Sequence, residues 1–247
     1  MSVPEQPRHD TLRLPTDGAV RVHPQPAALP RLRHEGPGRN RFDDPLAAFS
    51  VRYAADTLRG CLVETLARFR PHPETETLLR GIGAVDDDDP GEPLFTEPTS
   101  GVADWLAAQR VGHLQITSPV PLLVDIEQPA LLDQLDKHPQ VRAALDASGL
   151  GTPMDPARLD AGIIRLGGPI GRPITQAVSR AVYDWVPGAD GIGYWSRLDS
   201  GERCWAIYDH VPVSVTVSRL DPADAGQREA VRLVAHRFEI SLPPDWG

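Results

Sequence analysis

Two short runs in the first part of the chain alternate between apolar and polar positions, which is the pattern of a half-buried strand. One run covers 18–24, where a proline ends it, and the other covers 49–55. Between them, residues 24–47 hold prolines and arginines without any period, which predicts a loop. Residues 1–17 are polar and contain prolines, so we expect a flexible N-terminal arm.

Apolar positions at helical spacing follow the second run. Leu58, Leu62 and Phe69 lie on one side of a helix that Asp56 can cap and that Pro71 ends. The same periodicity predicts further helices at 100–110, 128–136, 139–147, 174–185 and 222–236, with a loop over 149–173. It predicts further strands at 113–116, 122–126, 193–197, 203–208, 213–218 and 238–242. Short strands interspersed with helices favour an α+β fold with a mixed sheet.

The composition narrows the class of protein. With 247 residues, of which 40% are hydrophobic, we expect one domain over 18–247, with an acidic, turn-rich insertion at 81–101. The net charge of −9 argues against non-specific binding of nucleic acid, which needs a basic surface. No apolar run approaches the roughly 18 residues that a membrane span needs. No secretory signal is recognisable at the N-terminus, so we expect a cytoplasmic protein.

The residues most suited to metal chemistry are sparse. The 2 cysteines are Cys61 and Cys204, and the 8 histidines are scattered without the spacing of a metal site. We therefore expect no metal. The sequence also lacks the glycine-serine-glycine elbow of a serine hydrolase, and Ser196 is a lone serine without a neighbouring histidine.

A glutamate interrupts the helix that follows the second strand. Glu64 falls on the side of Gly60 and Ala67, whose small side chains would let another group approach closely. Glu64 also precedes Arg68 by four residues, the spacing of a routine surface ion pair worth roughly a few tenths of a kcal/mol. The pattern alone leaves both interpretations open.

Tyr53 shares its strand face with Phe49 and Val51, so a buried core aromatic is one explanation for it. A functional tyrosine would instead stack on a flat heterocycle and use its hydroxyl to hold a polar group.

Three arginines could bind phosphate. Arg39 and Arg41 lie in a loop with glycine, where their planar forks suit a phosphate group, although loop arginines also serve solubility. Arg21 lies between two valines in the first strand, and it would suit a diphosphate only on the inner face of a cleft. The glycine-rich run 165–173 lacks the phosphate-loop spacing, so we expect a turn with weak phosphate-binding potential at the start of a helix.

Taken in order, these motifs resemble the RES-domain family, which is named for an arginine, a glutamate and a serine. The resemblance extends over most of residues 18–210. The residues that carry it are Arg21 in AVRVH, Arg41 with Phe42 and Pro45 in GRNRFDDP, Tyr53 in YAAD, Glu64 in CLVET, and Ser196 in GYWSRLDS. Arg39-Asn40 stands where the family has a glycine pair, so either Arg39 or Arg41 could occupy the arginine position.

The resemblance implies an ADP-ribosyltransferase-like α+β fold with a mixed or antiparallel sheet core flanked by helices. It implies an enzyme that cleaves the nicotinamide–ribose bond of NAD⁺, as a glycohydrolase or phosphorylase, with NAD⁺ as substrate and no added cofactor. Better understood members are toxins of bacterial toxin–antitoxin pairs, restrained by an antitoxin that often carries a helix-turn-helix domain. The implied catalytic residues are Glu64, Tyr53, Arg41 and Ser196, and the implied substrate-binding residues are Arg21, Arg39, Tyr53 and Ser196.

Two other functions stay open at this point. Some relatives are thought to transfer ADP-ribose to a protein, and a RES fold could also bind a nucleotide without turnover. The sequence does not choose among water, phosphate and protein as acceptor, and it leaves a homo-oligomer open.

Overall fold

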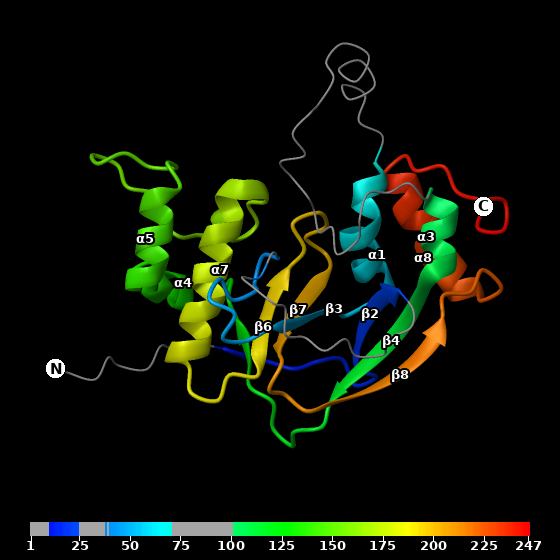
Figure 1. Ribbon diagram of the computed structural model, residues 1–247, viewed down its shortest axis with the longest axis horizontal. Helices are drawn as coiled ribbons and strands as arrows, with labels where there is room; N and C mark the ends of the chain where they lie inside the picture. Colours follow the sequence, from blue (N-terminus) through cyan, green and yellow to red (C-terminus); the bar gives the residue numbers. More distant parts are fainter. Residues whose placement is uncertain (1–9, 25–37, 39, 71–100) are drawn as a thin grey trace, which may run out of the picture.

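The computed structural model describes residues 10–24, 38, 40–70 and 101–247 (Figure 1). Arg39, residues 1–9 of the expected arm and nearly all of the expected insertion at 81–101 lie outside these residues.

A mixed sheet of eight strands forms the centre of the described structure, in the order β1-β5-β6-β7-β3-β2-β4-β8. Only the β5–β6 pair is parallel, and the other neighbours are antiparallel. The strands are β1 Thr11–Leu12, β2 Ala19–Pro24, β3 Val51–Ala55, β4 Gln109–Ile116, β5 Leu123–Asp125, β6 Gly191–Trp195, β7 Arg203–Tyr208 and β8 Val213–Arg219.

Helices flank the sheet in two groups (Figure 1). One group gathers near β2, β4 and β8 and contains α1 Leu58–Leu66, α3 Val102–Ala108 and α8 Ala225–Arg237. The other contains α4 Pro129–Leu135, α5 Pro139–Ala147 and α7 Gly168–Trp185. Two shorter elements of the described residues are η1 Ala67–Phe69 and α6 Ala161–Ile164. The predicted α+β class with a mixed sheet flanked by helices is confirmed.

The face of the sheet that carries the site is defined by the strand register. Ala55 of β3 pairs with Cys204 of β7, which pairs in turn with Tyr194 of β6, so the three side chains share one face. Helix α1 covers this face closely, because a Cβ built on Gly60 would lie 3.0 Å from the Cβ of Ala55. Helix α7 covers it further along, where the Tyr208 hydroxyl donates to the carbonyl of Ser179 at 3.1 Å. The two helices that bound the site therefore lie on the same side of the sheet.

The prediction of Asp56 as the cap of α1 is wrong. Thr57 is the cap, and its Oγ1 accepts the Gly60 N–H at 2.9 Å. Asp56 instead accepts the Trp205 indole N–H at 2.7 Å. Burial raises the pKa of the Asp56 carboxyl, and the bond from Trp205 partly opposes that rise.

The expected loop over 149–173 is wrong in its second half, because α6 lies there and α7 begins at Gly168 rather than at residue 174. Pro169 is compatible with the first turn of α7, where backbone N–H groups have no helical partner. Pro173 lies inside the helix and gives up one backbone bond. The prolines and glycines of this run concealed the first six residues of α7.

Other boundaries also differ from the prediction. Strand β4 begins at Gln109 rather than 113, which shortens the helix expected at 100–110. The strand expected at 238–242 is absent, since Phe238 caps α8 and Glu239 takes a positive φ of 57°. Within the expected arm, Thr11 and Leu12 pair with β5 as an edge strand.

Candidate active site

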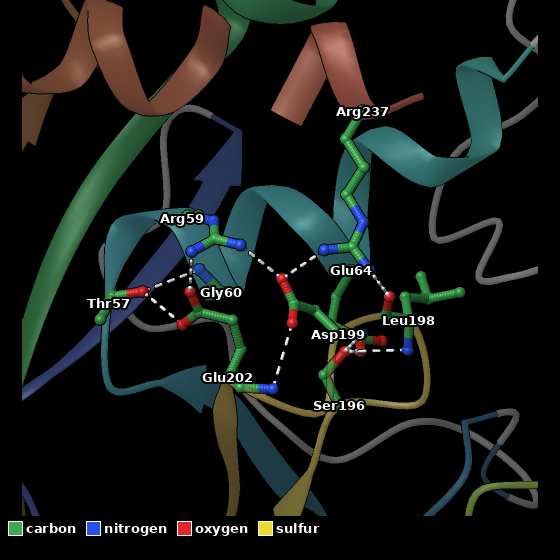
Figure 2. A network of polar contacts seen from close by, with 10 residues as sticks. Thr57, Arg59, Gly60, Glu64, Ser196, Leu198, Asp199, Glu202 and Arg237 are labelled. Carbon is green, nitrogen blue, oxygen red and sulfur yellow. Dashed lines mark hydrogen bonds and ion pairs between the residues drawn. The ribbon is translucent and has the colours of Figure 1, made fainter. Parts of the chain in front are cut away.

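A short hydrogen bond joins the predicted glutamate and serine. Ser196 follows β6, is 1% exposed, and donates its Oγ–H to Oε1 of Glu64 on α1 at 2.5 Å (Figure 2). The same Oγ accepts the backbone N–H groups of Leu198 at 3.1 Å and Asp199 at 3.2 Å. A hydroxyl has one proton and two lone pairs, so these three bonds use its full capacity. The two N–H donors therefore direct the serine proton to Glu64.

Glu64 reaches Ser196 because of how α1 packs. Its neighbours Gly60, Cys61, Leu62, Val63 and Leu66 are buried, whereas Glu64 itself is half-buried on the flank of the helix. The close approach expected at Gly60 does occur, but it is made by the protein. A Cβ at that position would lie 2.9 Å from Oε2 of Glu202.

Tyr53 holds the loop that carries Arg41. Its hydroxyl accepts the Phe42 N–H at 2.9 Å and donates to Oδ1 of Asp43 at 3.1 Å. The Phe42 ring then packs against Tyr194 of β6, with 4.5 Å between the ring centroids. Tyr53 therefore has a structural role in addition to any contact with a ligand. The hydrogen bonds of its hydroxyl fix the backbone next to Arg41.

Arg41 is anchored by one nitrogen. Its Nη2 donates to the carbonyl of Ile164 at 2.6 Å, and its guanidinium lies 5.0 Å from the Phe42 ring centroid and 5.2 Å from that of Tyr194. Its Nε and Nη1 are buried and have no hydrogen-bond partner among the residues that the structure describes. Buried polar groups are rarely left unmatched, because each such donor costs about 1–3 kcal/mol. These two donors are the clearest opening for an anionic ligand.

Arg41 and Glu64 both act on the same buried thiol. Burial raises the pKa of Cys204 well above its usual value, the charge of Glu64 adds to the rise, and the charge of Arg41 opposes it. The carboxylate and the guanidinium therefore both lie near Cys204, whose side chain is on the face of the sheet that α1 covers. The thiol itself stays neutral, so it is a poor nucleophile.

Arg197, an arginine after β6 that the sequence did not single out, lies against the start of α7. A Cβ built on Gly167 would lie 2.0 Å from Nη1 of Arg197, so the guanidinium of Arg197 lies directly against Gly167. Gly167 caps α7, and the Arg41 anchor at Ile164 is three residues before it. A helix start carries partial positive charge, so two arginines beside it favour a bound anion. The only signal in the sequence was the position of Arg197 next to Ser196.

Arg21 lies at a different point of the sheet. Its Nη1 donates to the carbonyl of Tyr53 at 3.1 Å. Where β2 pairs with β3, Val20 lies opposite Ala55. Arg21 is the next residue of β2, so its bond to Tyr53 joins the two strands at the point where their pairing ends. Side chains alternate along a strand, so the Arg21 side chain leaves β2 on the face opposite Val20. The structure thus brings Arg41, Glu64 and Ser196 together and gives Arg21 a contact to the backbone of β3.

The described residues, 10–24, 38, 40–70 and 101–247, hold neither a cluster of metal-ligating side chains nor a membrane-spanning helix. They contain no group of three or more histidine, cysteine, aspartate or glutamate side chains that could hold a metal ion. No helix in the same part of the chain is both long and apolar enough to cross a membrane.

The fold and the site define a class: α+β proteins in which a helix glutamate, a serine after a strand and a loop arginine converge on one face of a mixed sheet. A family model described as RES domain matches residues 19–229, and the chain belongs to this family. Comparisons with curated proteins and with solved structures found no match. The observed fold is consistent with the ADP-ribosyltransferase-like architecture of RES domains, and the family is consistent with an NAD⁺-related, toxin-like role.

Proposed function

We propose that this protein cleaves the nicotinamide–ribose bond of NAD⁺. The observation that carries the proposal is the pair of buried, unmatched donors on Arg41, within the described structure, on the same face as a glutamate that Ser196 orients. A dinucleotide offers both groups a partner, because its diphosphate is anionic and its nicotinamide ribose becomes cationic during cleavage.

The reaction needs charge stabilisation more than acid catalysis. The bond between the ribose C1′ and the nicotinamide nitrogen breaks, and its electron pair leaves with nicotinamide, whose positive charge is thereby neutralised. Positive charge then develops on the ribose, where the carboxylate of Glu64 stabilises it. The acceptor oxygen bonds to C1′. Water as acceptor gives ADP-ribose, and hydrogen phosphate as acceptor gives ADP-ribose phosphorylated at that carbon. In either case the acceptor oxygen gives up its proton.

The other residues divide between binding and orientation. Arg41 binds the diphosphate through Nε and Nη1, and Arg197 supplies a second positive charge beside the start of α7. Ser196 orients Glu64 through the bond to Oε1. Tyr53 fixes the Arg41 loop through Phe42, and we assign to its ring the contact with the nicotinamide ribose.

The test is incubation of purified protein with NAD⁺, with and without phosphate, and separation of the products. We expect nicotinamide in equal amount to the NAD⁺ consumed, and the second product identifies the acceptor. NAD⁺ that stays intact over hours at micromolar protein refutes the proposal, and calorimetric binding without turnover would then favour a nucleotide-binding protein. Label transferred from NAD⁺ to a protein would favour ADP-ribosylation.

Family membership also supports a role as the toxin of a toxin–antitoxin pair, acting on cytoplasmic NAD⁺ and restrained by a helix-turn-helix antitoxin. Expression of the chain alone should then stop growth and deplete NAD⁺, and co-expression of the product of the neighbouring reading frame should restore both. Normal growth with a normal NAD⁺ level argues against the toxin role.

A further inference from the structure

A polar network behind the Ser196–Glu64 pair links it to the last helix of the chain (Figure 2). Leu198 and Asp199, which follow β6, are the two residues whose N–H groups bond Ser196. Arg237 of α8 holds both of them from the other side. Its Nη2 donates to the Leu198 carbonyl at 2.6 Å, and its Nη1 donates to Oδ2 of Asp199 at 2.6 Å.

A second arginine completes the network from the start of α1. Nη2 of Arg59 also donates to Oδ2 of Asp199 at 2.6 Å, and its Nη1 lies 3.5 Å from Oε1 of Glu202. Glu202 in turn accepts the Thr57 hydroxyl at 2.7 Å. Asp199 therefore connects α1, α8 and the β6–β7 turn, and two arginines balance two carboxylates.

Arg237 lies outside the part of the chain that the family model matches, which ends at residue 229. The Arg237 contacts with the β6–β7 turn are therefore contributed by the C-terminal segment of this chain, in addition to the contact that Arg59 makes from α1. No substrate contact is needed for it to affect the site, because Arg237 acts on the same two residues that direct the Ser196 proton.

We propose that Asp199 and Arg237 are positioning residues for the Ser196–Glu64 pair. The fork of Arg237 fixes Leu198 and Asp199, their N–H groups fill the lone pairs of Ser196, and the serine proton is left for Glu64. A residue that orients a catalytic carboxylate in this way controls the rate of the chemical step more than substrate affinity.

The solvent exposure of the two arginines distinguishes a positioning role of Arg237 from a purely structural role. The side chains of Arg59 and Arg237 are 44% and 42% exposed, whereas that of Asp199 is 12% exposed. Ion pairs with such exposed arginines contribute little to stability. Loss of Arg237 should therefore leave the fold intact while loosening the turn.

The experiment compares Arg237→Gln, Arg237→Lys and the isosteric Asp199→Asn with a control, Arg232→Gln. Arg232 lies on the same helix, is 55% exposed and pairs only loosely with Glu229, at 3.7 Å. We expect kcat for NAD⁺ cleavage to fall about tenfold in Arg237→Gln with KM changed less than about twofold. Arg237→Lys should recover part of the loss, because one ammonium replaces one of the two contacts. Arg232→Gln should match the wild type.

A second readout needs no substrate. Amide hydrogen exchange at Leu198 and Asp199 should become about tenfold faster in Arg237→Gln and stay unchanged in Arg232→Gln. Unchanged exchange overturns the inference, and so does faster exchange with an unchanged kcat. The kcat readout rests on the proposed function. If the wild-type protein leaves NAD⁺ intact, that function fails, and exchange alone then decides whether Arg237 holds the turn.

Discussion

Replacing Ser196 by alanine tests the centre of the site, because one hydroxyl there makes three hydrogen bonds. Its Oγ donates to Glu64 at 2.5 Å and accepts from the N–H groups of Leu198 and Asp199 at 3.1 and 3.2 Å. Ser196 is 1% exposed, so water has little access to replace the lost oxygen. The variant should therefore lose stability as well as activity.

The expected size follows from the bonds that are lost. An unmatched buried N–H costs about 1–3 kcal/mol, and the lower end applies because Leu198 and Asp199 are half-buried. Glu64 is half-buried as well, and water can solvate its carboxylate, so we add nothing for it. Two N–H groups give a loss of about 2 kcal/mol in the free energy of unfolding. For a chain of this size the melting temperature should fall by roughly 4–8 °C.

Urea unfolding and calorimetry measure the change, and Ser179→Ala is the matched control. Ser179 is 0% exposed on α7, and its Oγ is buried without a hydrogen-bond partner among the described residues. Its removal should therefore cost little or be slightly stabilising. If the two alanine variants lose the same stability, the three bonds at Ser196 contribute nothing measurable, and the argument from hydroxyl capacity is refuted.

Three further predictions concern neighbouring groups. Glu64→Gln should lower kcat for NAD⁺ cleavage at least about 100-fold with the melting temperature unchanged within about 3 °C, since the amide keeps an acceptor for Ser196 but loses the charge; undiminished turnover removes Glu64 from its role. Arg41→Lys should weaken ADP-ribose binding about tenfold in calorimetry, because an ammonium cannot replace the fork, and an unchanged Kd refutes that contact. Asp56→Asn should raise the melting temperature at pH 7 while keeping an acceptor for Trp205. Because burial raises the pKa of Asp56 in the folded protein, wild-type stability gains as pH falls through that pKa, so the advantage of the variant should vanish in acid, and a constant difference from pH 7 to pH 3 contradicts this.

Elements whose signal is local were predictable from the sequence. Strand β3 and helix α1 follow from alternation and then helical spacing within some twenty residues, although α1 ends at Leu66 and η1 replaces its predicted last turn. The first third of helix α7 was missed because it is rich in glycine and proline, which usually signal a turn. The start of β4 was missed because Ala107, Ala108, Gln109 and Arg110 are good helix formers that continue the helix before it, and the strand state of Gln109 depends on pairing with Pro24.

The candidate site likewise contains residues that were predicted from the sequence and residues that could not be predicted. The resemblance to the RES-domain family implied Arg41, with Arg39 as its alternative, Glu64 and Ser196. The structure joins Glu64 to Ser196 by a hydrogen bond and places Arg41 against Tyr194 on the same face of the sheet. Arg237 and Asp199 could not be found, because they are 38 residues apart and each looks like an ordinary surface charge in its own segment. Only the fold brings α8 to the β6–β7 turn.

The number of hydrogen bonds that a group can still make distinguishes the groups that orient other residues from the groups that bind the substrate. The Ser196 hydroxyl has its donor and both lone pairs in use, so it cannot also bind nicotinamide without giving up the bond to Glu64 or one from the turn. Arg41 is the opposite case, with one nitrogen anchored and two buried donors unmatched within the described structure. A ligand that satisfies those two donors gains their full hydrogen-bond energy against no competing protein partner among the described residues. Binding affinity should therefore depend mainly on Arg41, and rate on the Glu64 carboxylate that Ser196 holds in place.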